Sequence, residues 1–143
     1  MKHEEITENI IGVLYEVYNE LGDGFLESVY EQSMAIALSE AGLQVVRQAP
    51  ISVHFRGQVV GDFRADLLVN NQVIVELKAA RAIERVFEAQ IMNYLRATNV
   101  EVGLLMNFGP KPEFKRFIYD NERKAVNKSR PRIPRMNTDE EKS

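Results

Sequence analysis

Residues 61–78 read GDFRADLLVNNQVIVELK, two apolar runs typical of β-strands with a polar loop between them. Side chains alternate between the faces of a strand, so Glu76 and Lys78, two residues apart, point to the same side. If the first run folds back as the antiparallel neighbour, Asp66 can join them. Two carboxylates and one ammonium would then share one patch of sheet, which is the outline of a hydrolytic site built around a hard divalent cation.

The pairing register of this hairpin decides whether the site forms. Asp66 lies opposite Glu76 only if residues 70–72 form a three-residue loop. A two-residue turn at residues 70–71, the commoner closure, would place Asp66 opposite Val75 and on the wrong face unless a bulge intervened. Asn tolerates the positive φ that a three-residue loop usually needs. The sequence therefore permits both registers, and the first of them gives a site.

The composition is that of an ordinary globular domain. The chain has 143 residues, of which 45% are hydrophobic and 27% are charged. It has no cysteine, which excludes disulfides and thiolate metal sites and fits a reducing compartment. The N-terminal residues lack the pattern of a signal peptide, and no apolar run reaches the roughly 18 residues that a membrane helix needs. We therefore expect a soluble, cytoplasmic protein with no membrane partner.

Charge is unevenly distributed along the chain, whose net charge is −3. Residues 122–143 carry seven Lys and Arg against four acids, a net of +3, so residues 1–121 carry −6. We expect residues 1–121 to form one domain and residues 122–143 to form a basic, flexible tail. The acidic domain argues against nucleic-acid binding, because phosphate contacts dominate such affinity. The basic tail and a bound divalent cation could offset the negative charge of the domain. A solvated tail without a role is the simpler interpretation.

The spacing of apolar residues predicts an α-α-β-β-β-α-β order followed by a short helix. Gly22 and Gly42 are expected to end the first two helices, and Gly109 to Pro112 should break the chain before the last one. The predicted helices cover residues 6–21, 25–41, 83–97 and 113–119, and the predicted strands cover residues 51–55, 59–69, 73–78 and 100–107.

This order, with acids on the second and third strands, resembles the PD-(D/E)XK nuclease-like fold. Residues 24–30, GFLESVY, match the signature from which the GxxExxY family of that superfamily is named. The resemblance covers about Glu4 to Asp120. It implies an α/β fold, or α+β by strand order, in which helices flank a central mixed sheet.

The same resemblance implies which residues form the site. Glu27 matches a helical Glu that often adds a metal ligand, and Gln90 with Tyr94 resembles the QxxxY pattern of RecB-type members. Ala65 stands where the superfamily name has Pro, a position that ligates nothing. The D…ExK core corresponds to Asp66, Glu76 and Lys78. The implied ligands of Mg²⁺ or Mn²⁺ are Glu27, Asp66, Glu76 and the carbonyl of Leu77, and the implied catalytic residues are Asp66, Glu76, Lys78 and Gln90.

Lys78 would orient an attacking water or balance the charge that develops on the phosphate. Residues expected to support the site or to contact the substrate are Tyr30, Tyr94, Arg81 and Arg85. The two tyrosines have no predicted metal contact. For the two arginines, solubility on a helix surface is the commoner explanation.

Each of these residues could also have a purely structural role. Glu27 could cap a helix through its position three residues after Gly24. Glu76 and Lys78 could form an exposed cross-strand pair worth less than about 1 kcal/mol. Asp66 could cap the end of the strand or pair with Arg64, which shares its face. Gln90 and Tyr94, at i and i+4, could simply bridge the helix to the sheet by hydrogen bonds.

The sequence thus predicts a metal-dependent nuclease acting on DNA or RNA. The alternative from another class is a non-catalytic module that keeps the nuclease fold and binds nucleic acid or a protein partner, in one version as a homodimer. Joint presence of Asp66, Glu76 and Lys78 favours the enzyme, and the acidic domain favours the binding module.

Overall fold

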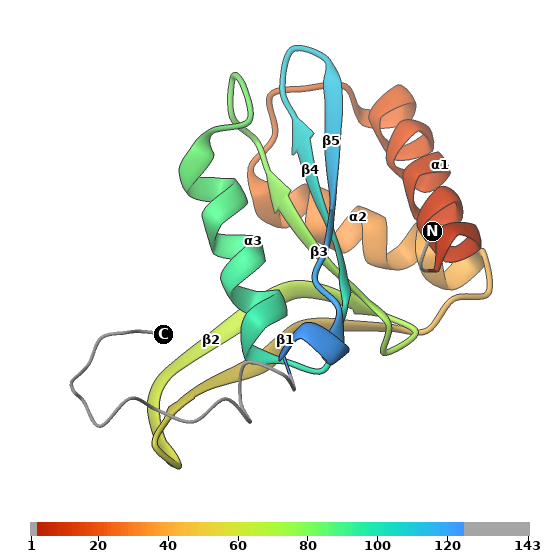
Figure 1. Cartoon of the computed structure of the whole chain (residues 1–143). Helices are drawn as coiled ribbons and strands as arrows, with labels where there is room; N and C mark the ends of the chain where they lie inside the picture. The colour runs from red at the N-terminus through yellow and green to blue at the C-terminus, as the bar shows by residue number, and fades with distance from the viewer. Residues whose placement is uncertain (1–2, 125–143) are drawn as a thin grey trace.

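A computed structural model describes residues 3–124 of the protein (Figure 1). Their elements form a five-stranded sheet with α1 and α2 on one face and α3 on the other. The elements are α1 (Glu4–Leu21), α2 (Glu27–Glu40), β1 (Val45–Phe55), β2 (Gln58–Val69), β3 (Val73–Lys78), α3 (Arg85–Ala97), β4 (Val102–Phe108) and β5 (Pro112–Ile118). Most of the predicted basic tail, residues 125–143, lies outside the described residues.

The strand order β1-β2-β3-β4-β5 follows the chain. β3 and β4 are parallel and are connected through α3, whereas every other neighbouring pair is antiparallel. The sheet is therefore mixed and flanked by helices, as expected from the sequence. The three long helices and the first four strands also fall where the apolar spacing predicts them, with ends displaced by a few residues and β1 beginning earlier.

The helix predicted at residues 113–119 is wrong, because this segment is strand β5, which pairs antiparallel with β4. Phe114 and Ile118 are four residues apart. This spacing puts two side chains on the same side of either a helix, with 3.6 residues per turn, or a strand, with its two-residue alternation. Both pack on the α1–α2 side of the sheet, whereas Phe117 packs on the α3 side. Pairing with β4 satisfies the backbone of the segment and buries both sets of side chains, so the strand prevails.

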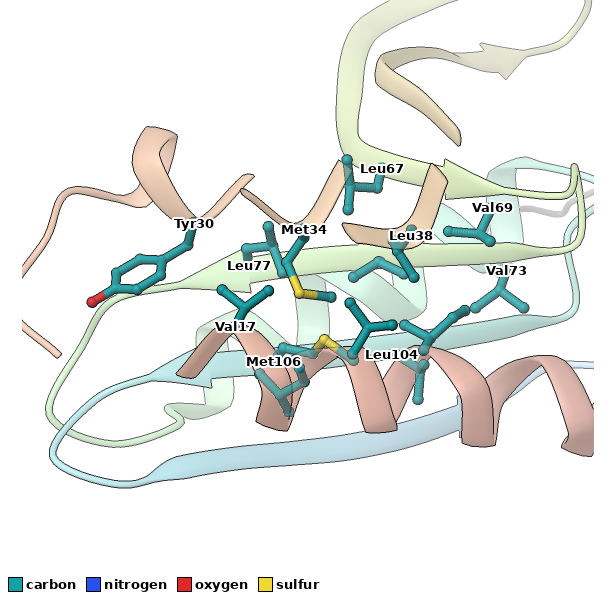
Figure 2. Close-up of a cluster of buried hydrophobic side chains, with 14 of the residues drawn as sticks. Val17, Tyr30, Met34, Leu38, Leu67, Val69, Val73, Leu77, Leu104 and Met106 are labelled. Atoms are coloured by element: carbon teal, nitrogen blue, oxygen red, sulfur yellow. The ribbon is translucent and has the colours of Figure 1, made fainter. Parts of the chain in front are cut away.

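The core divides into two apolar clusters, one on each face of the sheet. The larger cluster lies under α1 and α2, and Figure 2 shows Met34 and Leu38 of α2 packed over Leu77 and Leu104 of the sheet. β3 and β4 contribute to both clusters and are buried along nearly their whole length. Glu76 therefore lies within one of the most buried segments of the protein.

The hairpin adopts the register that places Asp66 opposite Glu76. Leu67 pairs with Val75 and Val69 pairs with Val73, which leaves residues 70–72 as the three-residue loop. Asn70 and Asn71 have φ values of 53° and 55°, the positive φ that favours Asn at such positions. The strand pairing ends at Leu67 and Val75, so Asp66 and Glu76 are the first opposed residues beyond it.

A kink divides the β1–β2 hairpin at the same point. Gln48 of β1 has a φ of 54°, and it lies between the regular pairs Arg47–Leu67 and Ala49–Ala65, opposite Asp66. Leu67 packs in the α1–α2 cluster, but Ala65 packs in the α3 cluster. The outer half of the hairpin therefore turns its apolar residues toward α3, and Asp66 lies where β2 leaves β3.

Candidate active site

Asp66 and Glu76 each accept a hydrogen bond from the backbone of the strand that carries the other. The backbone N–H of Asp66 donates to Oε2 of Glu76 at 2.8 Å, and the backbone N–H of Leu77 donates to Oδ2 of Asp66 at 2.8 Å. The two carboxylates thus take the place of the carbonyl acceptors that a continued strand ladder would supply. Each acid is held by the strand that carries the other, which fixes the position of both.

Both acids resist ionisation in this environment. Glu76 is only 3% exposed, and its pKa rises to about 8 because burial disfavours the anion and the charge of Asp66 repels it. Burial also raises the pKa of Asp66, and the charges of Glu31 and Glu27 add to this effect. Lys78 lowers the pKa of both acids but does not cancel the increase. A cation placed between the two carboxylates would relieve this repulsion.

A polar chain on α3 faces the acid pair. Nζ of Lys78 donates to Oε1 of Gln90 at 3.4 Å, and Nε2 of Gln90 donates to the hydroxyl of Tyr94 at 3.0 Å. The ammonium of Lys78 also lies 4.8 Å from the ring centroid of Phe87. The pKa of Tyr94 is raised by burial and by the charge of Glu76, which keeps its hydroxyl protonated. The predicted bridge from helix to sheet is present, and it ends at the lysine of the site.

Glu27 lies at the start of α2 rather than in a helix cap. The N-cap residue of α2 is Leu26, and no side-chain hydrogen bond caps this helix, so the cap interpretation of Glu27 is wrong. The side chain is exposed, yet its charge raises the pKa of both Asp66 and Glu76. Glu27 therefore faces the acid pair without joining its hydrogen bonds.

Glu31 is a residue near the site that the sequence reasoning missed. It is 8% exposed, and its carboxylate accepts hydrogen bonds from Nε of Arg47 at 3.1 Å and from Nε2 of Gln48 at 2.8 Å. Its position gave a signal, because residues 31, 34 and 38 form a helical stripe whose other members, Met34 and Leu38, are buried. An acid in such a stripe needs a partner, and here the partners are on the kinked part of β1.

The four residues predicted to support the site occupy different surroundings. Tyr94 belongs to the polar chain on α3. Tyr30 donates to the carbonyl of Gly22 at 2.7 Å and stacks on Phe108 at 4.2 Å between ring centroids, so its contacts fix the loop before α2. Figure 2 shows Tyr30 at one end of the α1–α2 cluster. Arg81 and Arg85 are exposed on the connection after β3 and at the start of α3.

Two of the purely structural roles, the exposed Glu76–Lys78 pair and the Asp66–Arg64 pair, do not fit the geometry. Glu76 is too buried to form an exposed surface pair with Lys78. Arg64 donates to the carbonyl of Gln48 at 3.0 Å, whereas the carboxylate of Asp66 accepts from Leu77. The hydrogen bonds of the Asp66 and Glu76 carboxylates therefore run between the two strands, and not to Arg64 or Lys78.

The described residues contain no group of three or more His, Cys, Asp or Glu side chains placed to hold a metal ion. Two carboxylates converge, and one oxygen of each is engaged by a backbone amide. Mg²⁺ commonly uses one or two protein carboxylates and completes its octahedron with water and substrate phosphate. The acid pair fits such an ion as a two-carboxylate site, and Glu27 does not complete it in this conformation.

A mixed sheet flanked by helices, with an acid pair and a lysine where a hairpin opens, is the architecture of a nuclease fold. The profile of the PD-(D/E)XK nuclease superfamily matches residues 4–117, so the chain belongs to this superfamily. No curated protein sequence matches the chain significantly. No helix within residues 3–124 is long and apolar enough to cross a membrane.

One solved structure supports the fold. The crystal structure of SSO0001 is similar with a TM-score of 0.53 and 14% identity, over 71% of this chain and 55% of that one. The chain thus spans about half the length of SSO0001. An alkaline exonuclease (LHK-Exo) from Laribacter hongkongensis has a TM-score of 0.43 and 10% identity, over 90% of this chain and 77% of that one.

Proposed function

We propose that the protein is a metal-dependent nuclease that hydrolyses DNA or RNA phosphodiester bonds, and that it belongs to the GxxExxY branch of its superfamily. The observation that supports this most strongly is the reciprocal Asp66–Glu76 pair with Lys78 beside it. Two mutually repelling acids on neighbouring apolar strands destabilise the fold when no cation lies between them. A site for a divalent cation explains why both are present.

Mg²⁺ or Mn²⁺ is the proposed cofactor, in keeping with the divalent metals that PD-(D/E)XK nucleases typically use. Asp66 and Glu76 would hold the ion, with the carbonyl of Leu77 as a further oxygen donor and Glu27 as a more distant acid. When bound, the ion polarises the scissile phosphate and lowers the pKa of a bound water. The two backbone amides keep the carboxylates in place before the ion arrives.

The remaining residues act on charge and position. Lys78 would balance negative charge on the phosphate or orient the attacking water. Gln90 holds the ammonium of Lys78 and is itself held by Tyr94, so both residues set the direction of the lysine. Arg81 and Arg85 are exposed beside the site and are proposed to contact substrate phosphates, and Tyr30 supports the loop before Glu27.

The test is a cleavage assay on single- and double-stranded DNA and RNA with Mg²⁺ or Mn²⁺. The wild type should cleave at least one substrate, and a chelator should abolish cleavage. Asp66→Asn removes one anion while keeping the shape of the side chain, and should lower the rate at least about a hundredfold, since a metal contributes several kcal/mol to such a reaction. Equal rates for the two proteins would contradict the proposal.

The alternative is a non-catalytic module that binds nucleic acid or a protein partner. Two observations favour it: only two carboxylates converge within residues 3–124, and the charge outside the tail segment is negative. A cytoplasmic location and a homodimer remain predictions from the sequence. Binding without cleavage by any metal-loaded form would support this alternative.

A further inference from the structure

A groove of about 650 Å³ lies between the outer half of the β1–β2 hairpin and α3. The hairpin supplies Val53 and Phe63, and α3 supplies Val86, Gln90 and Tyr94. In Figure 1 the C-terminal part of α3 lies beside the curled strands β1 and β2. The groove exists because the kink at Gln48 and Asp66 turns the hairpin toward α3, so the same kink creates the groove and positions the acid.

The aromatic ring of Phe63 is a fixed platform at this groove. A Cβ added to Gly61 would lie 2.9 Å from Cε2 of Phe63, so the ring packs directly over the glycine backbone. On another side its centroid lies 6.1 Å from that of Tyr94, with an interplanar angle of 43°. Phe63 nevertheless remains 49% exposed. A large apolar ring that is held in place and still half exposed is suited to stacking.

The groove lining exposes two apolar side chains. Phe63 is 49% exposed, and Val86 of α3 is 64% exposed. Exposed apolar side chains gathered at a groove indicate a binding surface. Gln90 and Tyr94 line the groove and also form the polar chain to Lys78, so the groove adjoins the candidate active site.

The charge of the groove suits an anionic ligand. Its lining contains Arg96 and includes no acidic residue, although the domain as a whole is acidic. The amide nitrogen of Asn93 adds a donor that can meet the edge of a base, while its Oδ1 accepts a hydrogen bond from Arg96 at 3.1 Å. Gln90 also accepts a hydrogen bond from Lys78, so one side chain links the groove to the lysine of the site.

We propose that this groove binds an unpaired segment of nucleic acid, with a base stacked on Phe63 and the adjoining backbone directed toward Asp66 and Glu76. The direction toward the acids rests on the nuclease function proposed above, whereas the stacking does not. The volume lies within the range of about 300–1,000 Å³ typical of small-ligand sites, which is the size suited to individual unpaired bases. Aromatic stacking beside a cationic group is how single strands are bound without sequence preference.

The experiment measures binding without cleavage. Fluorescence polarisation would follow a labelled strand of about twelve thymidines, and a duplex of the same length, in the presence of a chelator. The wild type should bind the single strand at least about tenfold more tightly than the duplex. Phe63→Ala should weaken single-strand binding about tenfold, because stacking of one base is worth that much, and Phe63→Trp should preserve it.

Phe55→Ala is the matched control, because Phe55 is an equally exposed aromatic of the same hairpin that does not line the groove. It should change the affinity less than about twofold if stacking is specific to Phe63. If Phe63→Ala fails to fold, Phe63→Leu serves in its place, because leucine keeps the apolar contact with Gly61 but offers no aromatic face. Melting curves of each variant would establish that the folded state is being compared.

The outcomes separate this inference from the proposed function. Cleavage by the wild type together with unchanged affinity of Phe63→Ala would overturn the groove assignment and leave the nuclease function standing. Phe63-dependent binding of single strands without cleavage by any metal-loaded form would overturn the nuclease function and leave the groove assignment standing. Equal affinity for duplex and single strand, or binding of neither, would overturn the groove assignment.

Discussion

The two faces of the sheet are built from the same strands but are used differently. The face under α1 and α2 is a continuous apolar cluster in which Leu77 and Leu104 are almost fully buried (Figure 2). The face under α3 has a smaller cluster and also holds Lys78, Gln90 and Tyr94. Because side chains alternate along β3, Leu77 stabilises one face while its neighbours Glu76 and Lys78 serve the other. Stability and chemistry are thus separated within a single strand.

The largest expected effect is a loss of stability on the apolar face. Leu104→Ala removes a fully buried side chain, and should lower the free energy of unfolding by about 2–5 kcal/mol through lost burial and the cavity left behind. Urea denaturation measures this directly. A decrease below about 0.5 kcal/mol, the size expected at a surface position, would mean that this face is not the stabilising core.

On the other face of the sheet, replacing Glu76 is expected to increase the stability of the protein. The pKa of Glu76 is about 8 in the folded protein, above its ordinary value of 4.5, so the protonated acid is favoured by folding. This contribution is full below the unfolded pKa and is lost as the pH rises from about 4.5 through about 8. Without metal, Glu76→Gln should therefore be more stable than the wild type at pH 8, by on the order of a few kcal/mol.

Urea denaturation of Glu76→Gln and the wild type at pH 5 and pH 8, with a chelator present, measures whether the variant is the more stable protein. The difference between the two proteins should be small at pH 5 and larger at pH 8. If Glu76→Gln loses stability at pH 8 as Leu104→Ala does, the acid serves the fold and the separation of the two faces fails.

The smallest expected effect concerns Gln90. Gln90→Leu keeps the helix but removes the acceptor for Lys78, so the rate of cleavage should fall about tenfold while the melting midpoint changes little. Asn93→Leu, one turn further along the same exposed side of α3, is the control. Comparable rate losses in both variants would indicate that the groove, and not the orientation of Lys78, is responsible.

The sequence predicted both strands of the hairpin but left its register open. Asn70 and Asn71 accept positive φ, which permits the three-residue loop that places Asp66 opposite Glu76, but a two-residue turn was also compatible with the sequence. The sequence predicted β5 poorly because Phe114 and Ile118 fit a helix and a strand equally, and only the free edge of β4 decides between them. Local patterns therefore locate the strands of the hairpin, whereas strand pairing depends on the rest of the fold.

Three features of the site could not be read from the sequence. Alternation assumes an unbroken strand, so the kink at Gln48 and the groove that follows from it were not expected. Glu31 belongs to a buried stripe, but its partners Arg47 and Gln48 reach it only through the kinked strand. The N-terminus of α2 also begins later than expected, which changes the role available to Glu27.

Thermal unfolding during a titration with Mg²⁺ or Mn²⁺ shows whether Asp66 and Glu76 together hold a divalent cation. An ion that binds the folded state raises the melting midpoint as its concentration increases. We predict a rise for the wild type, larger at pH 8 than at pH 6 because the ion needs both acids deprotonated, and no rise for Asp66→Asn. Identical curves for the two proteins across the titration would contradict the claim.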